Sequence, residues 1–179
     1  MNAKTVELYT DGSCLKNPSG PSGIGYIIRY MDSDGKVVQL ERSQGYKSST
    51  SNRMEVLAAI TGITEIMSNI ENGAFGDVDK IIVFSDSKYV CDAITRRWIY
   101  MWKQNRWMTF SRTEVKNIDL WERIIEILDK LNNMAVDISI NHIRGHTGNT
   151  YNTITDRLAK GAAMVADNQI IDVGYKPPR

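Results

Sequence analysis

The chain has 179 residues, with 22 lysines and arginines against 21 aspartates and glutamates, and a formal net charge of +1 at pH 7. Hydrophobic residues make up 42% of the sequence and charged residues 24%, a balance typical of one folded domain with a sizeable core. This excludes a disordered chain and a protein that coats nucleic acid through net charge alone. Any polyanionic partner must therefore meet a local basic patch.

The sequence contains no signal for a membrane or for export. No apolar run approaches the roughly 18 residues needed to span a bilayer, and the first residues lack the apolar stretch of a signal peptide. The two cysteines, Cys14 and Cys91, form neither a disulfide framework nor a zinc-binding pattern. We therefore expect a reduced, cytoplasmic protein without membrane contact.

Hydrophobic periodicity predicts elements in the order β-β-β-α-β-α-α-β-α. Strands are expected at residues 4–10, 23–31, 36–45, 81–85 and 136–143. Helices are expected at residues 52–70, 87–104 (in pieces), 118–131 and about 153–166. Three consecutive strands favour antiparallel pairing, whereas strands reached through helices favour parallel pairing. The sequence thus predicts an α/β fold with a five-stranded mixed sheet and helices on both faces. One domain is expected over residues 1–166, followed by a C-terminal tail at 167–179.

Four carboxylates stand at the expected ends of these elements. Asp11 follows the first strand, where Asp11-Gly12 is expected to stop it, and Asp86 follows the buried strand 81–85. Glu55 and Asp156 are expected in the first turns of their helices. Because ligands of open α/β sheets bind at the carboxyl ends of strands, Asp11 and Asp86 are plausible neighbours, with the other two carboxylates supplied from helices.

Each carboxylate also has an ordinary structural interpretation. Asp11 and Gly12 can form a turn, and Asp86 can cap the following helix. Glu55 and Asp156 each stand three residues after a potential helix cap, which is the spacing of a capping box. Composition and periodicity leave this choice open. If the four converge, their repulsion calls for hard cations such as Mg²⁺ or Mn²⁺, and a pair of such ions clamps the reacting oxygens in phosphoryl transfer.

Several strings of residues are more specific than these patterns. In chain order they are Thr10-Asp11-Gly12-Ser13-Cys14, Asn17-Pro18, Ser51-Asn52-Arg53-Met54-Glu55, Ser85-Asp86-Ser87-Lys88-Tyr89-Val90, Gly145-His146-Thr147-Gly148 and Asp156-Arg157-Leu158-Ala159. Together they resemble the type 1 ribonuclease H family, in particular the bacterial enzymes with a basic protrusion, over residues 5 to about 165. The resemblance implies a ribonuclease H-like fold. It also implies an endonuclease that hydrolyses the RNA strand of RNA–DNA hybrids and leaves 5′-phosphate and 3′-hydroxyl ends.

The resemblance further implies roles for individual residues. It implies two Mg²⁺ ions, with Mn²⁺ as an alternative, held by Asp11, Glu55, Asp86 and Asp156, with Asp11 bridging both. His146, in a loop flanked by glycines, is expected to shuttle protons or to assist product release, although a surface loop histidine is the ordinary alternative. The residues expected to bind the substrate are an RNA-side group of Gly12, Ser13, Cys14 and Asn17, a DNA-side group of Thr50, Ser51 and Asn52, and also Lys88 and Asn152.

The segment 88–116, here called the handle, carries the basic patch that a polyanion requires. It holds seven lysines and arginines against two acidic residues, with three tryptophans between them. We interpret it as a duplex-binding element in which Lys103 and Arg106 meet phosphates and Trp98 or Trp102 faces DNA, whereas Trp107 is assigned to packing. The same pattern also suits a solvated helix with core tryptophans.

Three features depart from the family pattern. Ser51 stands where many relatives have asparagine, the loop 149–153 lacks the Pro-Glu and second Glu often found there, and the connection 70–79 is longer and rich in glycine. Two other functions stay open: a junction resolvase of the same fold, and a hybrid-binding module without catalysis. The Asp-Gly-Ser-Cys string and the handle oppose the first, and the complete carboxylate set opposes the second. We expect a monomer whose partner is an RNA–DNA hybrid.

Overall fold

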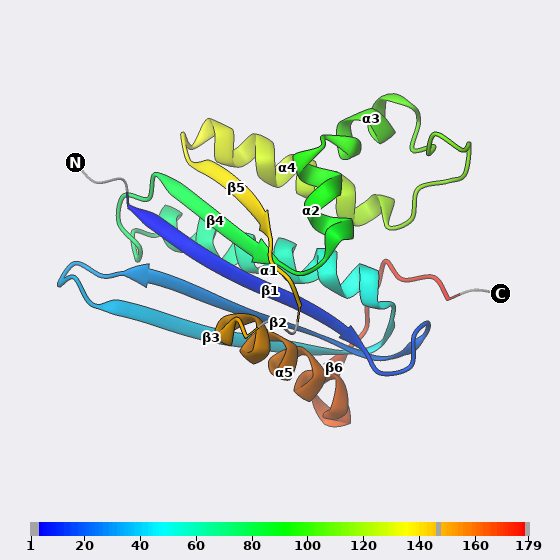
Figure 1. Cartoon of the computed structure of the whole chain (residues 1–179), viewed down its shortest axis with the longest axis horizontal. Helices are drawn as coiled ribbons and strands as arrows, with labels where there is room; N and C mark the ends of the chain where they lie inside the picture. The colour runs from blue at the N-terminus through cyan, green and yellow to red at the C-terminus, as the bar shows by residue number, and fades with distance from the viewer. Residues whose placement is uncertain (1–3, 146–147, 178–179) are drawn as a thin grey trace.

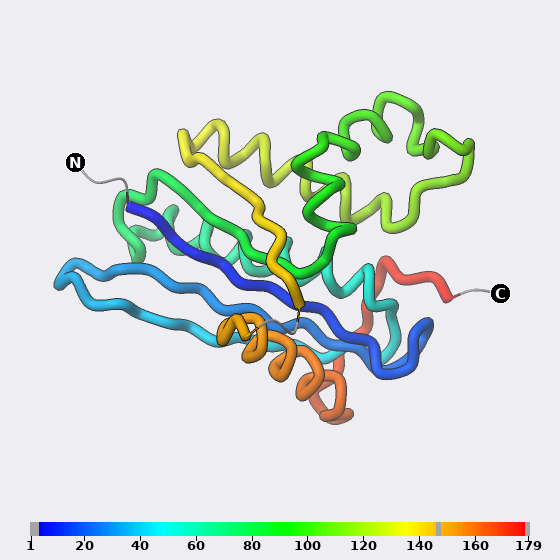
Figure 2. The backbone as a smooth tube through the Cα atoms, viewed as in Figure 1, coloured from blue at the N-terminus to red at the C-terminus, as the bar shows by residue number. Residues whose placement is uncertain are grey.

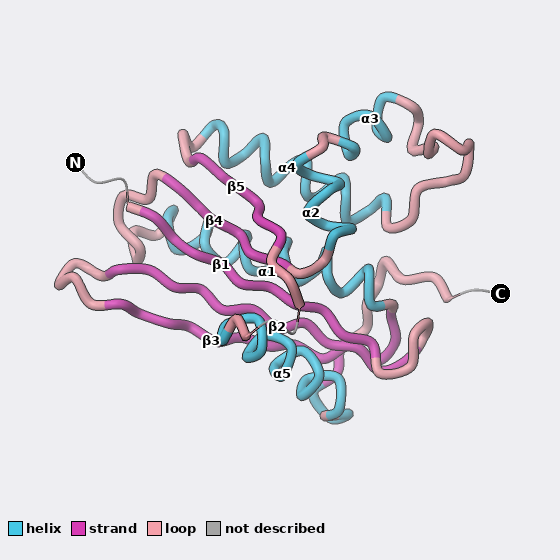
Figure 3. Tube along the Cα trace, viewed as in Figure 1, coloured by secondary structure: helices cyan, strands magenta, loops and turns pink. Residues whose placement is uncertain are grey.

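The computed structural model describes residues 4–145 and 148–177, in which helices and strands alternate much as the sequence predicts (Figures 1 and 3). The elements are β1 (Thr5–Cys14), β2 (Gly20–Met31), β3 (Val37–Ser49), α1 (Ser51–Glu71), β4 (Lys80–Ser85), α2 (Lys88–Thr95), α3 (Trp98–Gln104), α4 (Ile118–Asn133), β5 (Asp137–His142), α5 (Thr150–Met164), the 3-10 turn η1 (Ala166–Asn168) and β6 (Gln169–Ile170). Over these described ranges, no helix combines the length and apolarity needed to cross a membrane.

The strands form one mixed sheet in the order β5-β4-β1-β2-β3-β6. As predicted, β1, β2 and β3 pair antiparallel, and β4 and β5 extend the sheet in parallel from β1. The prediction of five strands is wrong, because β6 adds a sixth by pairing in parallel with Gly45 and Tyr46 of β3. A strand of two residues is too short to show an alternating pattern, so the sequence predicts only a tail there.

Helices cover both faces of the sheet. Helix α1 crosses one face and packs against α4, while α5 lies on the opposite face over β1, β2 and β3 (Figure 1). Helices α2 and α3, with the loop that leads to α4, project beyond the β4–β5 side of the molecule (Figure 2). The handle therefore lies at one side of the sheet, and its inner face, with Val90, Ala93 and Ile99, packs into the core.

The main core lies between the sheet, α1 and α4. Leu8 of β1, Ile24 of β2, Ile60 and Ile63 of α1, and Trp121 of α4 are at most 1% exposed. Burying each such side chain stabilises the fold by about 1.5–3 kcal/mol. This packing holds α1 firmly against β1, so the N-terminus of α1 has a fixed position at the edge where β4 ends.

Three element boundaries differ from the predicted ones and matter for the site. β1 does not stop at Asp11 but runs to Cys14, because β2 continues the antiparallel ladder beside it. Helix α5 begins at Thr150, so Asp156 lies in its second turn. Helix α1 begins at Ser51, which places Glu55 just beyond the first turn. A helix start predicted from apolar spacing comes late when, as here, the first turn is polar.

Candidate active site

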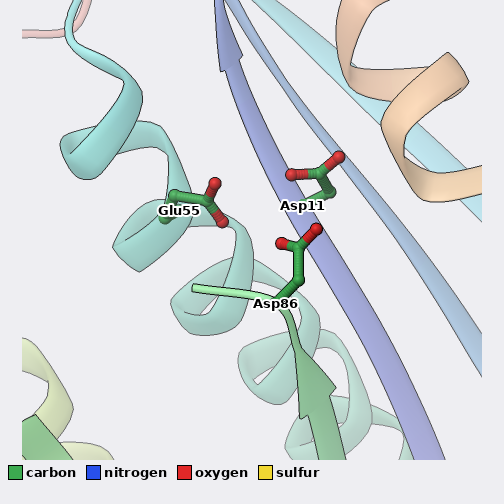
Figure 4. Close-up of side chains that lie close together, drawn as sticks. All are labelled: Asp11, Glu55 and Asp86. Atoms are coloured by element: carbon green, nitrogen blue, oxygen red, sulfur yellow. The ribbon is translucent and has the colours of Figure 1, made fainter. Parts of the chain in front are cut away.

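Two neighbouring parallel strands place Asp11 beside Asp86. In the β1–β4 ladder Thr10 is the partner of Ser85, so the next residue of each strand lies at the same edge of the sheet. β4 ends there whereas β1 continues, and the two carboxylates lie close together (Figure 4). The predicted proximity of Asp11 and Asp86 follows directly from this register.

Glu55 reaches the same place because α1 approaches β1 closely at Gly12. A Cβ atom on Gly12 would lie 2.3 Å from the backbone nitrogen of Glu55 and 2.4 Å from the carbonyl carbon of Met54. Only glycine permits this contact, so Gly12, predicted to line the RNA side, also has a packing role. As a result, carboxylate oxygens of Asp11, Glu55 and Asp86 all lie within 4.8 Å of one another (Figure 4).

This crowding changes the acidity of the cluster. Burial, followed by repulsion from Asp86 and Asp156, raises the pKa of Asp11 to about 7, although the Gly12 N–H donates to its Oδ1 at 2.8 Å. Burial and the charges of Asp11 and Asp86 raise the pKa of Glu55 well above its usual value. Within the described part of the chain, Glu55 Oε2 is buried and accepts no hydrogen bond. Converging carboxylate oxygens, one of them without a donor, fit a hard divalent cation.

Asp156 lies beside this cluster but does not join it. Asp11 pairs across the sheet with Gly25, where a Cβ atom would lie 2.5 Å from the carbonyl oxygen of Thr155, so α5 packs closely against the strands. The Asp156 carboxylate is ion-paired with Lys160 at 2.7 Å. The structure thus brings three of the four predicted ligands together and leaves the fourth at the rim. Lys160 was not predicted as a site residue, although its i,i+4 spacing from Asp156 is a recognisable ion-pair signal.

The four carboxylates line one pocket of about 290 Å³. Its lining residues are Asp11, Gly12, Ser13, Cys14, Ser51, Glu55, Asp86, Asn152, Thr153, Asp156 and Lys160. Predicted RNA-side and DNA-side residues therefore meet at the acidic cluster. His146 lies outside the described residues.

Two side chains hold Asp86 from the β5–α5 side. Asn152, predicted to bind substrate, donates from Nδ2 to Asp86 Oδ2 at 3.1 Å. His142 Nε2 lies 3.1 Å from the backbone carbonyl oxygen of Asp86. His142 was not predicted as a site residue, and its position at the end of an alternating strand gives no local signal of this contact.

The helix caps are residues other than the four carboxylates. Thr50 Oγ1 accepts from the N–H of Arg53 at 3.3 Å, and Ser87 caps α2. Asn149 Oδ1 accepts from the N–H groups of Tyr151 and Asn152 and so caps α5. In the described structure the carboxylates do not serve as these caps. Thr50 caps α1 and was also placed in the DNA-side group, and the same residue can serve both purposes.

The two groups predicted to contact the substrate strands lie next to each other. Asn17 Oδ1 accepts from the N–H of Ser51 at 3.2 Å, and Cys14 Sγ donates to the Ser49 carbonyl at 3.5 Å. Asn17 and Asn52 are exposed. One continuous surface thus runs from the RNA-side group to the DNA-side group.

The handle presents its charges to solvent. Its exposed cations are Lys88, Arg96, Arg97, Lys103, Arg106, Arg112 and Lys116. Trp102 lies between two other rings, 6.1 Å from Trp98 and 5.8 Å from Trp121, measured between ring centroids. This packing gives Trp98 and Trp102 a structural role, and Trp107 also packs partly buried against the core. Contact of Trp98 or Trp102 with DNA stays a prediction.

Fold and site together define an α/β nuclease of the ribonuclease H type, with an acidic cluster where β1, β4 and α1 meet. The RNase H family model matches residues 3–164. The chain is 42% identical over 162 residues to a ribonuclease H of Idiomarina loihiensis, covering 90% of each chain. It is 40% identical over 174 residues to one of Pseudoalteromonas translucida, covering 97% of this chain and 99% of the relative.

The chain therefore belongs to the ribonuclease H family, whose members cleave the RNA strand of RNA–DNA hybrids. Among solved structures, LC9-RNase H1, a type 1 enzyme, superposes with a TM-score of 0.73 at 25% identity. That match covers 97% of this chain and 80% of LC9-RNase H1. The resemblance found in the sequence strings is confirmed over most of the chain.

Proposed function

We propose that the protein hydrolyses the RNA strand of RNA–DNA hybrids by two-metal-ion catalysis, with Asp11, Glu55, Asp86 and Asp156 as ligands. Mg²⁺ is the proposed ion, with Mn²⁺ as an alternative, because the ligands are all hard oxygens. The observation that carries this proposal is the crowding of Asp11, Glu55 and Asp86 within 4.8 Å. When bound, such ions activate water and stabilise the leaving 3′ oxygen.

Individual residues of the chain have different roles in the proposed reaction. Asp11 occupies the centre, since burial and two neighbouring carboxylates all act on it. Asn152 and His142 hold Asp86 in place from the β5–α5 side. Asp156 already pairs with Lys160, so that ion pair competes with a metal for its carboxylate. We assign proton transfer or product release to His146, following the family resemblance.

Hybrid recognition requires contact with 2′-hydroxyls on one strand and with deoxyribose on the other. The adjacent RNA-side and DNA-side groups offer both, in a row that ends at the acidic cluster. LC11-RNase H1, whose structure was solved in complex with an RNA/DNA hybrid, has the same fold, with a TM-score of 0.60 at 21% identity. We infer a hybrid lying across this row, with the handle on the duplex flank.

A substrate panel tests the activity. With Mg²⁺, we expect cleavage of only the RNA strand of a doubly labelled hybrid, leaving 5′-phosphate and 3′-hydroxyl ends. Duplex DNA and a four-way DNA junction are expected to remain intact. Junction cleavage would indicate a resolvase, and hybrid binding without cleavage would indicate a binding module.

Neutralising Lys103 and Arg106 together is expected to weaken hybrid binding and its salt dependence. Each phosphate contact contributes about 0.9 to the slope of log K against log salt, so the double glutamine variant should lose about 1 to 2 from that slope. A matched control neutralises two exposed lysines outside the handle: Lys36, between β2 and β3, and Lys130, in the last turn of α4, which pairs with Glu71. An unchanged slope in the Lys103/Arg106 variant would remove the handle from the substrate interface.

We further propose a monomer, because one chain supplies all the proposed ligands. We also propose that it works in the cytoplasm, where its proposed RNA–DNA hybrid substrate would form. Residues 1–166 are proposed as the catalytic domain and residues 167–179 as a C-terminal tail whose β6 pairs with β3 of that domain. Sedimentation of the purified chain tests the monomer.

A further inference from the structure

The chain after β6 returns to the loops that border the active site. Asp172 is 5% exposed at its side chain, and its Oδ2 accepts from Ser49 Oγ at 2.8 Å and from Arg53 Nε at 2.7 Å. Its Oδ1 accepts from Arg53 Nη2 at 2.9 Å. These contacts fix the segment against the end of β3 and the first turn of α1, on either side of the DNA-side group.

Arg53 links this segment to the base of the handle. Its side chain is 3% exposed, and its Nη1 and Nη2 donate to the two carboxylate oxygens of Asp119 at 2.8 and 2.6 Å. Asp119 lies in the first turn of α4, where the chain returns from the handle. A buried guanidinium paired on two sides is rigid, because moving it would break charge-assisted hydrogen bonds that water cannot replace at a buried position.

Tyr175 carries the contact to the loop between β1 and β2. Its hydroxyl lies 2.6 Å from Ser19 Oγ. The Ser19 N–H donates to the Ser49 carbonyl at 2.8 Å, and Ser48 Oγ donates to the Ser19 carbonyl at 3.0 Å. Ser19 stands two residues after Asn17, the last member of the RNA-side group. The loop 15–19 is exposed, so such contacts decide how far it moves.

We propose that the segment 172–175 positions the RNA-side loop for substrate binding, with Tyr175 as the positioning residue. Asp172 fixes the segment through its ion pair with the buried Arg53. From this fixed segment, the Tyr175 hydroxyl hydrogen-bonds to the Ser19 side chain. The loop is thereby held beside the DNA-side group before a hybrid arrives, which lowers the ordering cost of binding. This inference rests on the proposed function, because it assigns Asn17 to the RNA strand.

The test separates positioning from a merely structural role. Tyr175→Phe and Ser19→Ala are each expected to raise KM for a hybrid about three- to tenfold, as for loss of one hydrogen bond, with kcat unchanged. The double variant is expected to match the single variants, because both remove the same contact. Amide exchange in the loop 15–19 should be faster in Tyr175→Phe. Tyr30→Phe, at the far end of β2, is the matched control.

The results of these experiments distinguish a positioning role of Tyr175 from a role in stability alone and from failure of the proposed function. Wild-type KM in Tyr175→Phe, or additive effects in the double variant, would overturn the positioning role even if the wild type cleaves hybrids normally. A lower Tm with wild-type KM would assign the contact to stability alone. Failure of the wild type to cleave hybrids would instead overturn the proposed function.

Discussion

Asp11→Asn is expected to lower the rate of hybrid cleavage in Mg²⁺ by at least about 10³-fold, which corresponds to about 4 kcal/mol of lost transition-state stabilisation. The substitution keeps the size of the side chain and an oxygen that can accept from the Gly12 N–H. It removes the negative charge at the centre of the three crowded carboxylates. The rate is measured in single turnover with a hybrid labelled on its RNA strand.

The control for this experiment is Asp129→Asn, which removes one negative charge from an exposed position on α4. Its rate is expected to equal that of the wild type. Wild-type activity in Asp11→Asn would contradict the assignment of Asp11 as a metal ligand.

The same substitution is expected to stabilise the metal-free protein. At pH 7.5 in a chelator, the Tm of Asp11→Asn should exceed that of the wild type by roughly 4–8 °C, for a gain of about 2 kcal/mol. The reason is that burial, Asp86 and Asp156 all oppose ionisation of Asp11 and raise its pKa to about 7. A lower Tm would instead show that Asp11 has a stabilising structural partner.

The raised pKa of Asp11 also determines how the stability of the protein without metal changes with pH. An aspartate in the unfolded chain titrates near pH 4, whereas folded Asp11 retains its proton to about pH 7. Between these values the folded state binds more protons than the unfolded state, so metal-free stability falls as pH rises. Thermal melts in a chelator from pH 4 to 8 should show this decline. Asp11→Asn should make the decline shallower, leaving the part due to Glu55, whose pKa is also raised, whereas Asp129→Asn should follow the wild type.

One part of the acidic cluster, the proximity of Asp11 and Asp86, could be predicted because it depends on neighbouring strands. Asp11 and Asp86 follow residues that are partners in the β1–β4 ladder, so element order alone suggests that they meet. The approach of Glu55 depends on Gly12, and a glycine in a sequence does not say which backbone it will touch. The resemblance to the ribonuclease H family identified Glu55 instead. The motif strings carry the set of site residues without the packing that brings them together.

Other contacts leave no local pattern to recognise. Arg53 and Asp172 are 119 residues apart, and the string that contains Arg53 gives no sign of a partner so distant in the sequence. β6 was missed for the related reason that its two residues are defined by their partner strand. Asp156 was predicted as a ligand, yet its carboxylate pairs with Lys160 in the structure. Competition between two partners for one side chain is set by geometry and bound ions, which a sequence pattern does not contain.

The central claim is that the crowded carboxylates form a cation site, and that their mutual repulsion destabilises the fold when no cation is bound. It is tested most directly by melting wild type and Asp11→Asn with increasing Mg²⁺ at pH 7.5. A ligand that binds only the folded state stabilises it by RT ln(1 + [L]/Kd), so 10 mM Mg²⁺ at a Kd of about 1 mM would add about 1.4 kcal/mol. We predict that Mg²⁺ raises the Tm of the wild type by a few degrees and that of Asp11→Asn much less. Equal shifts in the two proteins, or no shift in the wild type, would contradict the claim.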